Sequence, residues 1–465
     1  MPSAHSDLEK YLRELLAAVK TETALPGLAV AISIDGVDVT VSEGVLVADQ
    51  RQPFSVDARF QLGCITKMLT GLVAAALIHE GTLHGATPIS AYLSELRGCE
   101  FANRVTVNHL MSHTSGYQGL ALGEPGVNYY YTWQKFLTFL QESPVLFEPG
   151  TVFNYEHTES VLLGEIIRCT TGTEIIPLFQ EEIFDPLGLA VGQLAADQQT
   201  PALCVGDHVY DRGKQAYTQI KSIPFGPFWR ASLSDLTASL GDMVKLAEAF
   251  IKLLDGRSAA LSRMLAPKPV EHIIRQAISV PDMDGMGVPE QFPLTFGHGV
   301  ADYGGPLYGH NGSARGQTCG LRFDPKHRIA VGVGLNAWQP HIRDYLISKV
   351  LAEVVGYRRP SRSVLPLSLP ISAYIGRYVG ARGIDILVTE APHGLKASIG
   401  NQGQARRFEI SLSENANGVL KPTSNTLHHR IGFFANPGGD VPCIMLGMSA
   451  FKKQYSGAPE AQCAL

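Results

Sequence analysis

The distribution of strand-forming and helix-forming segments restricts the fold of this chain more than any other feature. Residues 28–34 and 37–42 are rich in apolar and β-branched residues and are separated only by Asp35-Gly36, which predicts a β-hairpin. Strand character returns around residues 296–336, whereas residues from about 58 to 255 follow a mainly helical pattern. A sheet built from both ends of this segment, with helices inserted between them, is an α+β arrangement.

A second unit is expected after residue 357. At 465 residues the chain is too long for one compact core. Residues 358–370 are rich in Pro, Ser and Arg and are typical of a linker. From residue 371 onward, short apolar runs alternate evenly with Gly, Asn and Pro, which indicates a small antiparallel barrel or sandwich. We therefore expect a first domain over residues 1–357, a linker over 358–370 and a β domain over 371–465.

Charge and hydrophobic patterning exclude several classes of partner. The net charge is −5 and no run rich in Lys or Arg occurs, which argues against nucleic-acid binding. Apolar residues from Leu8 to Val19 recur at helical spacing among charged residues, which predicts an amphipathic surface helix rather than a secretory signal. The longest apolar stretch, Leu72 to Ile78, is too short to span a bilayer. We expect a cytoplasmic protein that binds neither nucleic acid nor membrane.

The cysteines give no sign of a disulfide framework or a metal centre. They number seven and stand at positions 64, 99, 169, 204, 319, 443 and 463. An odd number without a Cys-x-x-Cys pair fits neither a set of disulfides nor a zinc site, and we expect no metal or cofactor. Most of these thiols are expected to be buried as small apolar side chains.

Cys64 differs from the other cysteines in its context. It follows Gly63 at the start of a segment with helical spacing of apolar residues, and Lys67 comes three residues later. A thiol at the beginning of a helix faces N–H groups that favour the thiolate. Lys67, one turn away, can take the thiol proton if burial lowers its pKa. The alternative is that Cys64 is a core residue and Lys67 a surface lysine.

A family resemblance favours the chemical interpretation. The spacing of Cys64 and Lys67 resembles the Ser-x-x-Lys motif of penicillin-binding proteins and serine β-lactamases, with Cys64 in place of the serine. Four further segments resemble the same family in the same order, namely NHLMSHTSGYQGL (108–120), EPGTVFNYEHTESVLLGEIIRCTTG (148–172), LTASLGDMVKLAEAF (236–250) and YGHNGSARGQTCGLRFDP (308–325). The resemblance covers about residues 8–355 and is to the class C β-lactamase and esterase branch.

The resemblance also implies the architecture. We expect a β-lactamase/transpeptidase-like fold, in which an antiparallel sheet is flanked by helices and accompanied by an all-helical region. YIGRYVG, at residues 374–380, is similar to the first strand of the lipocalin-like domain appended to many such enzymes. The predicted C-terminal unit is therefore a small lipocalin-like antiparallel β-barrel, with any other small β domain as the alternative.

The same resemblance implies catalytic roles. Cys64 would be the nucleophile, and Tyr155 would move a proton between nucleophile and leaving group with its pKa lowered by Lys67. His310 would orient this relay or bind a substrate carboxylate. The backbone N–H groups of Cys64 and Ser313 would form the oxyanion hole, in which loss of one donor typically costs about 3–4 kcal/mol.

Three further residues are expected to contact the substrate. Two of them, Asn311 and Gly312, stand in the sequence His-Asn-Gly. Gly312 would leave room for an acyl group along the strand. His157 stands where the family usually has Asn, and its charge depends on pH, so substrate recognition is expected to differ here. His113 and Ser115 suggest a Ser-His hydrolase, but in the family this stretch is structural and no Gly-x-Ser-x-Gly motif supports that alternative.

The cysteine changes the expected reaction. An acyl-enzyme on Cys64 would be a thioester, whose exchange with a carrier-protein or coenzyme A thioester is close to thermoneutral. Thioesters also react with amines more readily than esters do, relative to water. Among relatives, the chain most resembles penicillin-binding-protein-type thioesterases and transacylases. The resemblance thus implies a biosynthetic acyltransferase or cyclase that takes a peptidyl or other acyl thioester, with a carrier protein among its partners, and passes the acyl group to an amine or alcohol.

Other interpretations stay open. One is a hydrolase that uses water, such as an esterase, a thioesterase or a D-amino-acid peptidase. Another is a non-catalytic binding descendant, against which the joint presence of Lys67, Tyr155 and Gly312 argues. A third is that Cys64 replaces a serine in order to trap an intermediate.

Overall fold

The computed structural model describes residues 2–455, apart from residues 49, 118, 120–131, 143–144, 195–202, 212, 222–225, 276–295, 298–299, 303–306, 315, 358–368, 381–383, 392–393, 402–407, 415–418, 423–430, 435–439 and 447–448. Most of the predicted linker therefore lies outside the described residues. Within them, none of the helices combines the length and apolar character needed to cross a bilayer.

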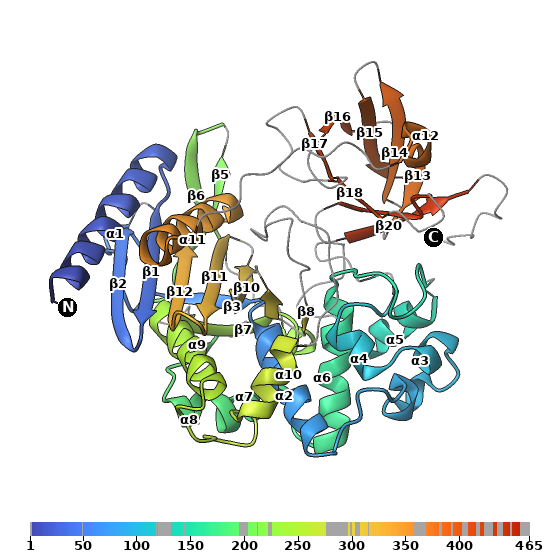
Figure 1. Ribbon diagram of the computed structural model, residues 1–465, viewed down its shortest axis with the longest axis horizontal. Coiled ribbons are helices and arrows are strands. Elements are labelled where there is room, and N and C mark those ends of the chain that lie inside the picture. The colour runs from blue at the N-terminus through green and yellow to red at the C-terminus, as the bar shows by residue number, and fades with distance from the viewer. Residues whose placement is uncertain are drawn as a thin grey trace.

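A seven-stranded antiparallel sheet forms the centre of the first part of the chain (Figure 1). Its strands in spatial order are β2 (Val37–Gly44), β1 (Gly27–Ile34), β12 (Ile329–Leu335), β11 (Gln317–Asp324), β10 (Tyr308–Ala314), β9 (Val300–Asp302) and β8 (Phe296–Gly297). Strand β1 of the first hairpin thus pairs with β12, about 300 residues further along the chain, which confirms the predicted α+β arrangement.

The turn between β1 and β2 explains the register of the hairpin. Ile34 pairs with Val37, so that only Asp35 and Gly36 form the connection. Both have positive φ, 50° and 88°, as a two-residue type I′ turn requires. Asp tolerates this conformation better than most side chains and Gly has no Cβ to oppose it, so the dipeptide fixes the pairing.

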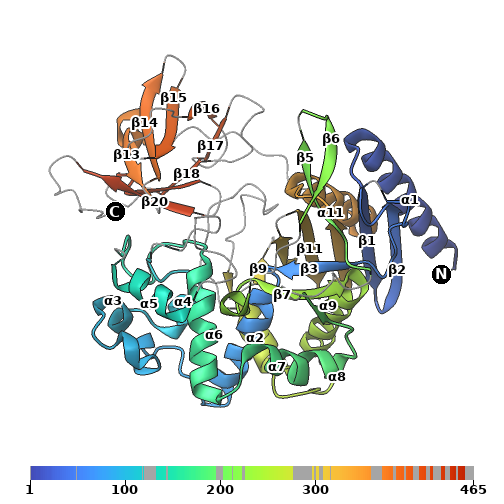
Figure 2. The ribbon, with the colours of Figure 1, turned by 180° about the vertical axis from the view of Figure 1, so that it is seen from behind.

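Helices cover both faces of the sheet (Figures 1 and 2). Val30 and Ile32 of β1 belong to a buried cluster shared with α1 (Pro2–Thr23) and α11 (Pro340–Val355). Ala29 and Ala31, which alternate with them, belong to a second cluster shared with α9 (Leu240–Leu254). The continuous apolar run of β1 is therefore explained by burial on both faces.

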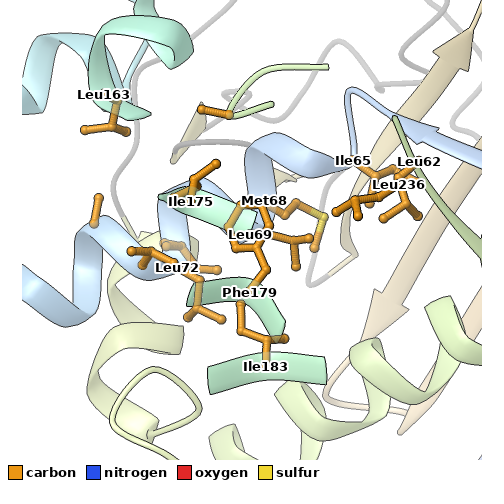
Figure 3. Packing of buried hydrophobic residues seen from close by; sticks show 14 of the residues in the cluster. Leu62, Ile65, Met68, Leu69, Leu72, Leu163, Ile175, Phe179, Ile183 and Leu236 are labelled. Carbon is orange, nitrogen blue, oxygen red and sulfur yellow. The ribbon is translucent and has the colours of Figure 1, made fainter. Parts of the chain in front are cut away.

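The second cluster extends into a helical region around α2 (Thr66–His79), as Figure 3 shows. Residues Thr66 to Leu77 are all buried, so this helix is surrounded by protein. Its neighbours include α6 (His157–Thr171), with α3 (Glu100–Arg104), α4 (Val107–Met111), α5 (Trp133–Glu142), α7 (Ile175–Phe179), η3 (Gln180–Phe184), α8 (Asp185–Leu187) and α10 (Pro267–Arg275) completing the region. Short 3-10 turns lie at Ile89–Ala91, Ser94–Leu96 and Pro227–Trp229.

Two small β elements lie inside the segment that the sequence marks as mainly helical. One is a three-stranded sheet in the order β3 (Arg59–Gly63), β7 (Ser234–Ser239) and β4 (Gly192–Gln193). The other is a hairpin of β5 (Asp207–Asp211) and β6 (Ala216–Ile220). Both consist of strands of two to six residues, too short for a periodic pattern to stand out. The first of these sheets matters for function because β3 leads directly to Cys64.

The C-terminal strands form a closed antiparallel barrel, as the sequence predicted in outline. It follows α12 (Ile371–Tyr374) and contains β13 (Gly376–Val379), β14 (Ile384–Ala391), β15 (Gly394–Asn401), β16 (Phe408–Glu414), β17 (Val419–Pro422), β18 (Ile431–Phe434), β19 (Cys443–Leu446) and β20 (Ser449–Gln454). A separate buried cluster that includes Tyr378 and Ile386 fills it. Its specific likeness to lipocalins stays a prediction.

The cysteines depart from expectation. Among those that the structure describes, Cys319 and Cys443 are buried, whereas Cys169 is exposed and the others are half-buried. The expectation that most would be buried is therefore wrong. The half-buried group includes Cys64.

Candidate active site

Gly63 brings Cys64 beside strand β10. β3 ends at Gly63, which has a φ of +50°, and Cys64 lies in the turn before α2. A Cβ at Gly63 would lie 2.5 Å from the carbonyl oxygen and 2.9 Å from the nitrogen of Ser313. Glycine is required here by both the backbone conformation and this close approach. The turn that carries Cys64 is thus packed against the backbone of Ser313.

Lys67 is completely buried at the centre of the candidate site. Its side chain has 0% exposure, and Nζ donates to the carbonyl oxygen of Ser232 at 3.1 Å. Nζ also lies 3.0 Å from Nδ1 of His157 and 4.9 Å from the centre of the Tyr155 ring. Burial lowers the pKa of the Lys67 amine below its usual range, and a hydrogen bond and charge interaction with Cys64 oppose part of that shift. An amine held in this way is suited to accept a proton from a neighbouring thiol.

Ser232 is a site residue that the sequence did not reveal. Besides accepting from Lys67 through its carbonyl oxygen, it places Oγ 2.8 Å from Nδ1 of His157. Trp229, three residues before Ser232, packs its ring edge-on against the His157 ring, with 6.3 Å between the ring centres. No motif marks the segment from 227 to 232, and only the tertiary structure brings it to Lys67.

His310 completes the ring of groups around Tyr155. Its ring centre lies 6.1 Å from that of Tyr155, and its Nδ1 contacts the carbonyl oxygen of Asn311. Burial lowers the pKa of His310 well below its usual range, and the positive charge of Lys67 acts in the same direction. His310 is therefore neutral, with Nδ1 as the donor and Nε2 carrying the lone pair.

The structure separates Asn311 from this group. A Cβ at Gly320 would lie 3.2 Å from Oδ1 of Asn311 and 2.9 Å from Cδ of Arg343, which belongs to α11. Oδ1 also accepts from Nη2 of Arg322 at 2.8 Å. The Asn311 side chain therefore lies on the α11 face of the sheet, whereas His310 lies on the face of Tyr155. The Asn311 side chain therefore does not lie beside Lys67, where its predicted contact with substrate would be made.

Gly312 is required by protein packing. A Cβ at this position would lie 2.3 Å from the carbonyl oxygen of Leu62 and 2.6 Å from Sγ of Cys319. The predicted reason for this glycine was space for an acyl group. The contacts give a different reason, which is that strand β10 packs directly on the end of β3.

A buried polar cluster lies under Tyr155. The rings of His113 and Tyr155 are 4.7 Å apart between centres, and Nδ1 of His113 contacts Oε2 of Glu159. The other oxygen, Oε1, accepts from the backbone N–H of Ser115 at 3.2 Å and from its hydroxyl at 2.7 Å. Burial raises the pKa of Glu159 to about 8 and lowers that of His113 well below its usual range. His113 and Ser115 thus contact a carboxyl group that supports Tyr155.

No metal site accompanies these groups in the part of the chain that the structure describes. Within that part, no group of three or more His, Cys, Asp or Glu side chains is placed to hold a metal ion. The side chains described above bring together a thiol, a buried amine, a phenol and imidazoles.

The sequence profile of the Beta-lactamase family matches residues 8–354, which contain all of these groups. The chain belongs to the β-lactamase family. It is 26% identical over 375 residues to penicillin-binding protein 4 of Amycolatopsis lactamdurans, which covers 77% of this chain and 93% of the relative. It is also 26% identical over 294 residues to a D-aminopeptidase of Cereibacter sphaeroides, covering 60% of this chain and 51% of that relative. The chain thus spans about half the length of the D-aminopeptidase.

The crystal structure of SurE shares the fold with a TM-score of 0.74 and 20% identity, over 97% of this chain and all of that chain. At this identity the likeness concerns the fold alone. Family membership supports an enzyme of the hydrolase and acyltransferase type that forms an acyl-enzyme. The nucleophilic role of Cys64 stays a prediction that these likenesses do not test.

Proposed function

We propose that this protein is an acyltransferase that carries the acyl group as a thioester on Cys64. The donor is a thioester, of the carrier-protein or coenzyme A type, and the acceptor is an amine or alcohol. The observation that carries the proposal is the buried amine of Lys67, which hydrogen-bonds Cys64 and is held by Ser232 and His157. Burying a lysine costs free energy, so a lysine with 0% exposure in a family active site points to a function.

The first half-reaction follows from these contacts. The Cys64 thiol gives its proton to the Lys67 amine, and Sγ attacks the carbonyl carbon of the donor thioester. A tetrahedral oxyanion forms and then expels the thiolate of the donor, which takes the proton back from Lys67. Sγ is then bonded to the acyl carbon. Tyr155, whose ring lies 4.9 Å from Lys67 Nζ, is the group proposed to pass the proton when the leaving group is too far for the amine.

The backbone around Gly63 supports an oxyanion hole in the predicted position. The close approach of Gly63 to Ser313 brings the turn of Cys64 next to the backbone nitrogen of Ser313 in strand β10. Two backbone N–H groups converging on one oxygen stabilise a tetrahedral intermediate without reorganisation. We assign the N–H groups of Cys64 and Ser313 to this role.

The second half-reaction decides between transfer and hydrolysis. An acceptor amine attacks the thioester on Cys64, loses a proton to the relay, and releases Sγ as a thiolate. Thioesters prefer amines over water more strongly than esters do, which favours transfer. The D-aminopeptidase among the relatives has a hydrolase name, and water is therefore the rival acceptor.

The test is to incubate the protein with acyl thioesters and measure the intact mass. N-acetylcysteamine thioesters of short peptides ending in a D- or an L-amino acid, together with an acyl-coenzyme A, sample the donor class. We expect one acyl group per chain, located at Cys64 by peptide mapping and released by hydroxylamine. Adding amines should give amide in excess over free acid.

Matched variants identify the labelled thiol. Cys64→Ala should abolish the adduct, whereas Cys99→Ala, which removes another half-buried thiol, should leave it unchanged. Cys64→Ser should still react if the site accepts either nucleophile, and comparing its turnover with that of the natural chain shows whether the cysteine only traps the intermediate. Labelling at any other residue, or no labelling by any donor, would refute the proposal. Acid as the sole product would replace it by the hydrolase.

A further inference from the structure

We infer that Asn154 is a positioning residue through which the C-terminal barrel holds Tyr155 in its catalytic orientation. The inference rests on the proposed function, since it concerns the same proton-transfer tyrosine. It also assigns a role to the barrel, which lies outside the residues that match the family, 8–354.

Asn154 joins three separate segments. It is 3% exposed, and its backbone N–H donates to the carbonyl oxygen of His113 at 2.8 Å. Its side-chain Nδ2 donates to the carbonyl oxygen of Tyr117 at 3.1 Å. Its Oδ1 accepts from the backbone N–H of Ala450, in strand β20 of the barrel, at 2.9 Å. Both ends of the amide are therefore used, one towards the first domain and one towards the barrel.

The β19–β20 hairpin is built to serve both the barrel and the first domain. Ile444 pairs with Phe451, and both belong to the core of the barrel. Cys443 and Ala450 alternate with them along the two strands, are 2% exposed, and belong instead to the cluster that contains Phe153. Because successive side chains point to opposite faces, this hairpin buries one face inside the barrel and the other against the first domain.

The N–H group of Ala450 is available because of the strand register. Strand β13 pairs with β20 from Lys452 to Gln454, and Ala450 lies before this paired segment. Asn154 takes the N–H that a neighbouring strand would otherwise use. The barrel is thus tied to the segment of Tyr155 by a buried hydrogen bond and not only by apolar packing.

Tyr155 directly follows this anchored residue. Its ring lies 4.7 Å from that of His113, whose carbonyl oxygen Asn154 also binds, and 4.9 Å from Lys67 Nζ. Proton transfer through Tyr155 depends on these separations, and small displacements of catalytic groups have large effects on rate. Release of Asn154 from Ala450 should therefore slow acylation of Cys64 while leaving donor binding largely intact.

Asn154→Asp gives a readout that a purely structural role would not move. A protonated carboxyl has the shape of the amide, accepts from Ala450 and donates to the carbonyl oxygen of Tyr117. Once ionised, it loses the donor and faces that oxygen with a negative charge. We expect the ratio of acylation rates, variant over natural protein, to be near one at low pH. It should fall about ten-fold as the introduced carboxyl ionises, which corresponds to about 1.4 kcal/mol.

Ala450 supplies the matched pair from the barrel side. Ala450→Pro removes the N–H donor, whereas Ala450→Gly keeps it. We expect the maximal acylation rate to fall about ten-fold for Pro with little change in half-saturating donor concentration, and to stay within about two-fold for Gly. In the double variant with Asn154→Ala, the loss should equal that of Asn154→Ala alone, because the hydrogen bond that Ala450→Pro removes is then already absent.

The outcomes separate this inference from the proposed function. Labelling of the natural protein together with unchanged rates for Asn154→Asp and Ala450→Pro overturns the inference alone. If the natural protein is not labelled, the proposed function fails. The inference is then judged by hydrogen exchange of residues 147–155, which should be faster in Ala450→Pro than in Ala450→Gly and would overturn it if equal. The same exchange comparison applies if Asn154→Asp fails to fold.

Discussion

Glu159 offers the most direct test of the electrostatics under Tyr155. Because burial raises its pKa to about 8, the side chain is protonated at neutral pH and donates to neutral His113. Its other oxygen accepts twice from Ser115. Glu159→Gln keeps this pattern, because the glutamine Oε1 accepts from Ser115 and its Nε2–H donates to His113. The substitution therefore removes a titratable group and keeps both sets of hydrogen bonds.

The sign and size of the effect follow from linkage. A carboxyl whose pKa rises from 4.5 unfolded to about 8 folded keeps its proton in the folded protein over a range where the unfolded chain has lost it. Its contribution to stability is complete below about pH 4.5 and is lost as pH rises through about 8. At about 1.36 kcal/mol for each pH unit in this window, the loss is up to about 5 kcal/mol. His113 is present in both proteins, so its contribution cancels in the comparison.

Urea unfolding followed by tryptophan fluorescence measures this difference. The three tryptophans, at positions 133, 229 and 338, all precede the barrel, so the signal reports the first domain. We expect Glu159→Gln to match the natural protein at about pH 4, where the carboxyl is protonated in both the folded and the unfolded state. It should become more stable by about 2 kcal/mol between about pH 6.5 and about pH 8.

The control is the same change at Glu165, on the same helix but paired with Arg168 near the surface. It should give a difference that does not vary with pH over this range. A difference for Glu159→Gln that stays constant from about pH 5 to about pH 8 would show that Glu159 does not hold its proton in the folded protein. The account of the cluster under Tyr155 would then be wrong.

Substitutions at three other positions test the rest of the site. Lys67→Met should abolish acylation of the candidate nucleophile, yet leave the protein folded by circular dichroism. It should also flatten the rise of stability towards pH 10.5, because burial lowers the pKa of Lys67 and the folded protein releases that proton before the unfolded chain does. Gly312→Ala should lower stability by about 1–3 kcal/mol in urea, since its Cβ would lie 2.3 Å from the carbonyl oxygen of Leu62; an unchanged midpoint would contradict the packing described. His157→Asn should keep acylation within about ten-fold because an oxygen still accepts from Lys67, whereas His157→Leu should lose more than that; equal rates would remove His157 from the relay.

The sequence predicted the parts of the fold that repeat a strong local pattern. The hairpin around Asp35-Gly36, the buried helix after Cys64 and the strands that return after residue 296 all follow from periodicity and turn chemistry. The sequence did not predict the two-residue strand β4 or the hairpin at Asp207–Ile220, because strands this short show almost no hydrophobic periodicity.

The candidate site divides in the same way. Lys67, Tyr155 and His310 stand in recognisable motifs, and the structure gathers them. Ser232 contacts Lys67 through its main chain and His157 through its hydroxyl group, but no motif surrounds it in the sequence, so only the tertiary structure identifies it. Asn154 was passed over because its importance lies in a contact almost 300 residues away, with a strand whose own position depends on the barrel.

The proposed cysteine nucleophile, in place of the serine of the family motif, agrees with the burial of Lys67. An ordinary thiol ionises near pH 8.5, whereas a hydroxyl group is a far weaker acid. Burial lowers the pKa of Lys67, so its amine is neutral more often and can accept a proton, but it also becomes a weaker base. For a serine this weakening makes proton removal harder and leaves more of the work to Tyr155. Because a thiol is the stronger acid, the Lys67 amine takes a proton from a cysteine more easily than from a serine. A nucleophilic cysteine at this position would therefore lower the dependence of acylation on Tyr155. We expect Tyr155→Phe to slow acylation less in the natural protein than in Cys64→Ser. An equal or larger effect in the natural protein would contradict this reasoning.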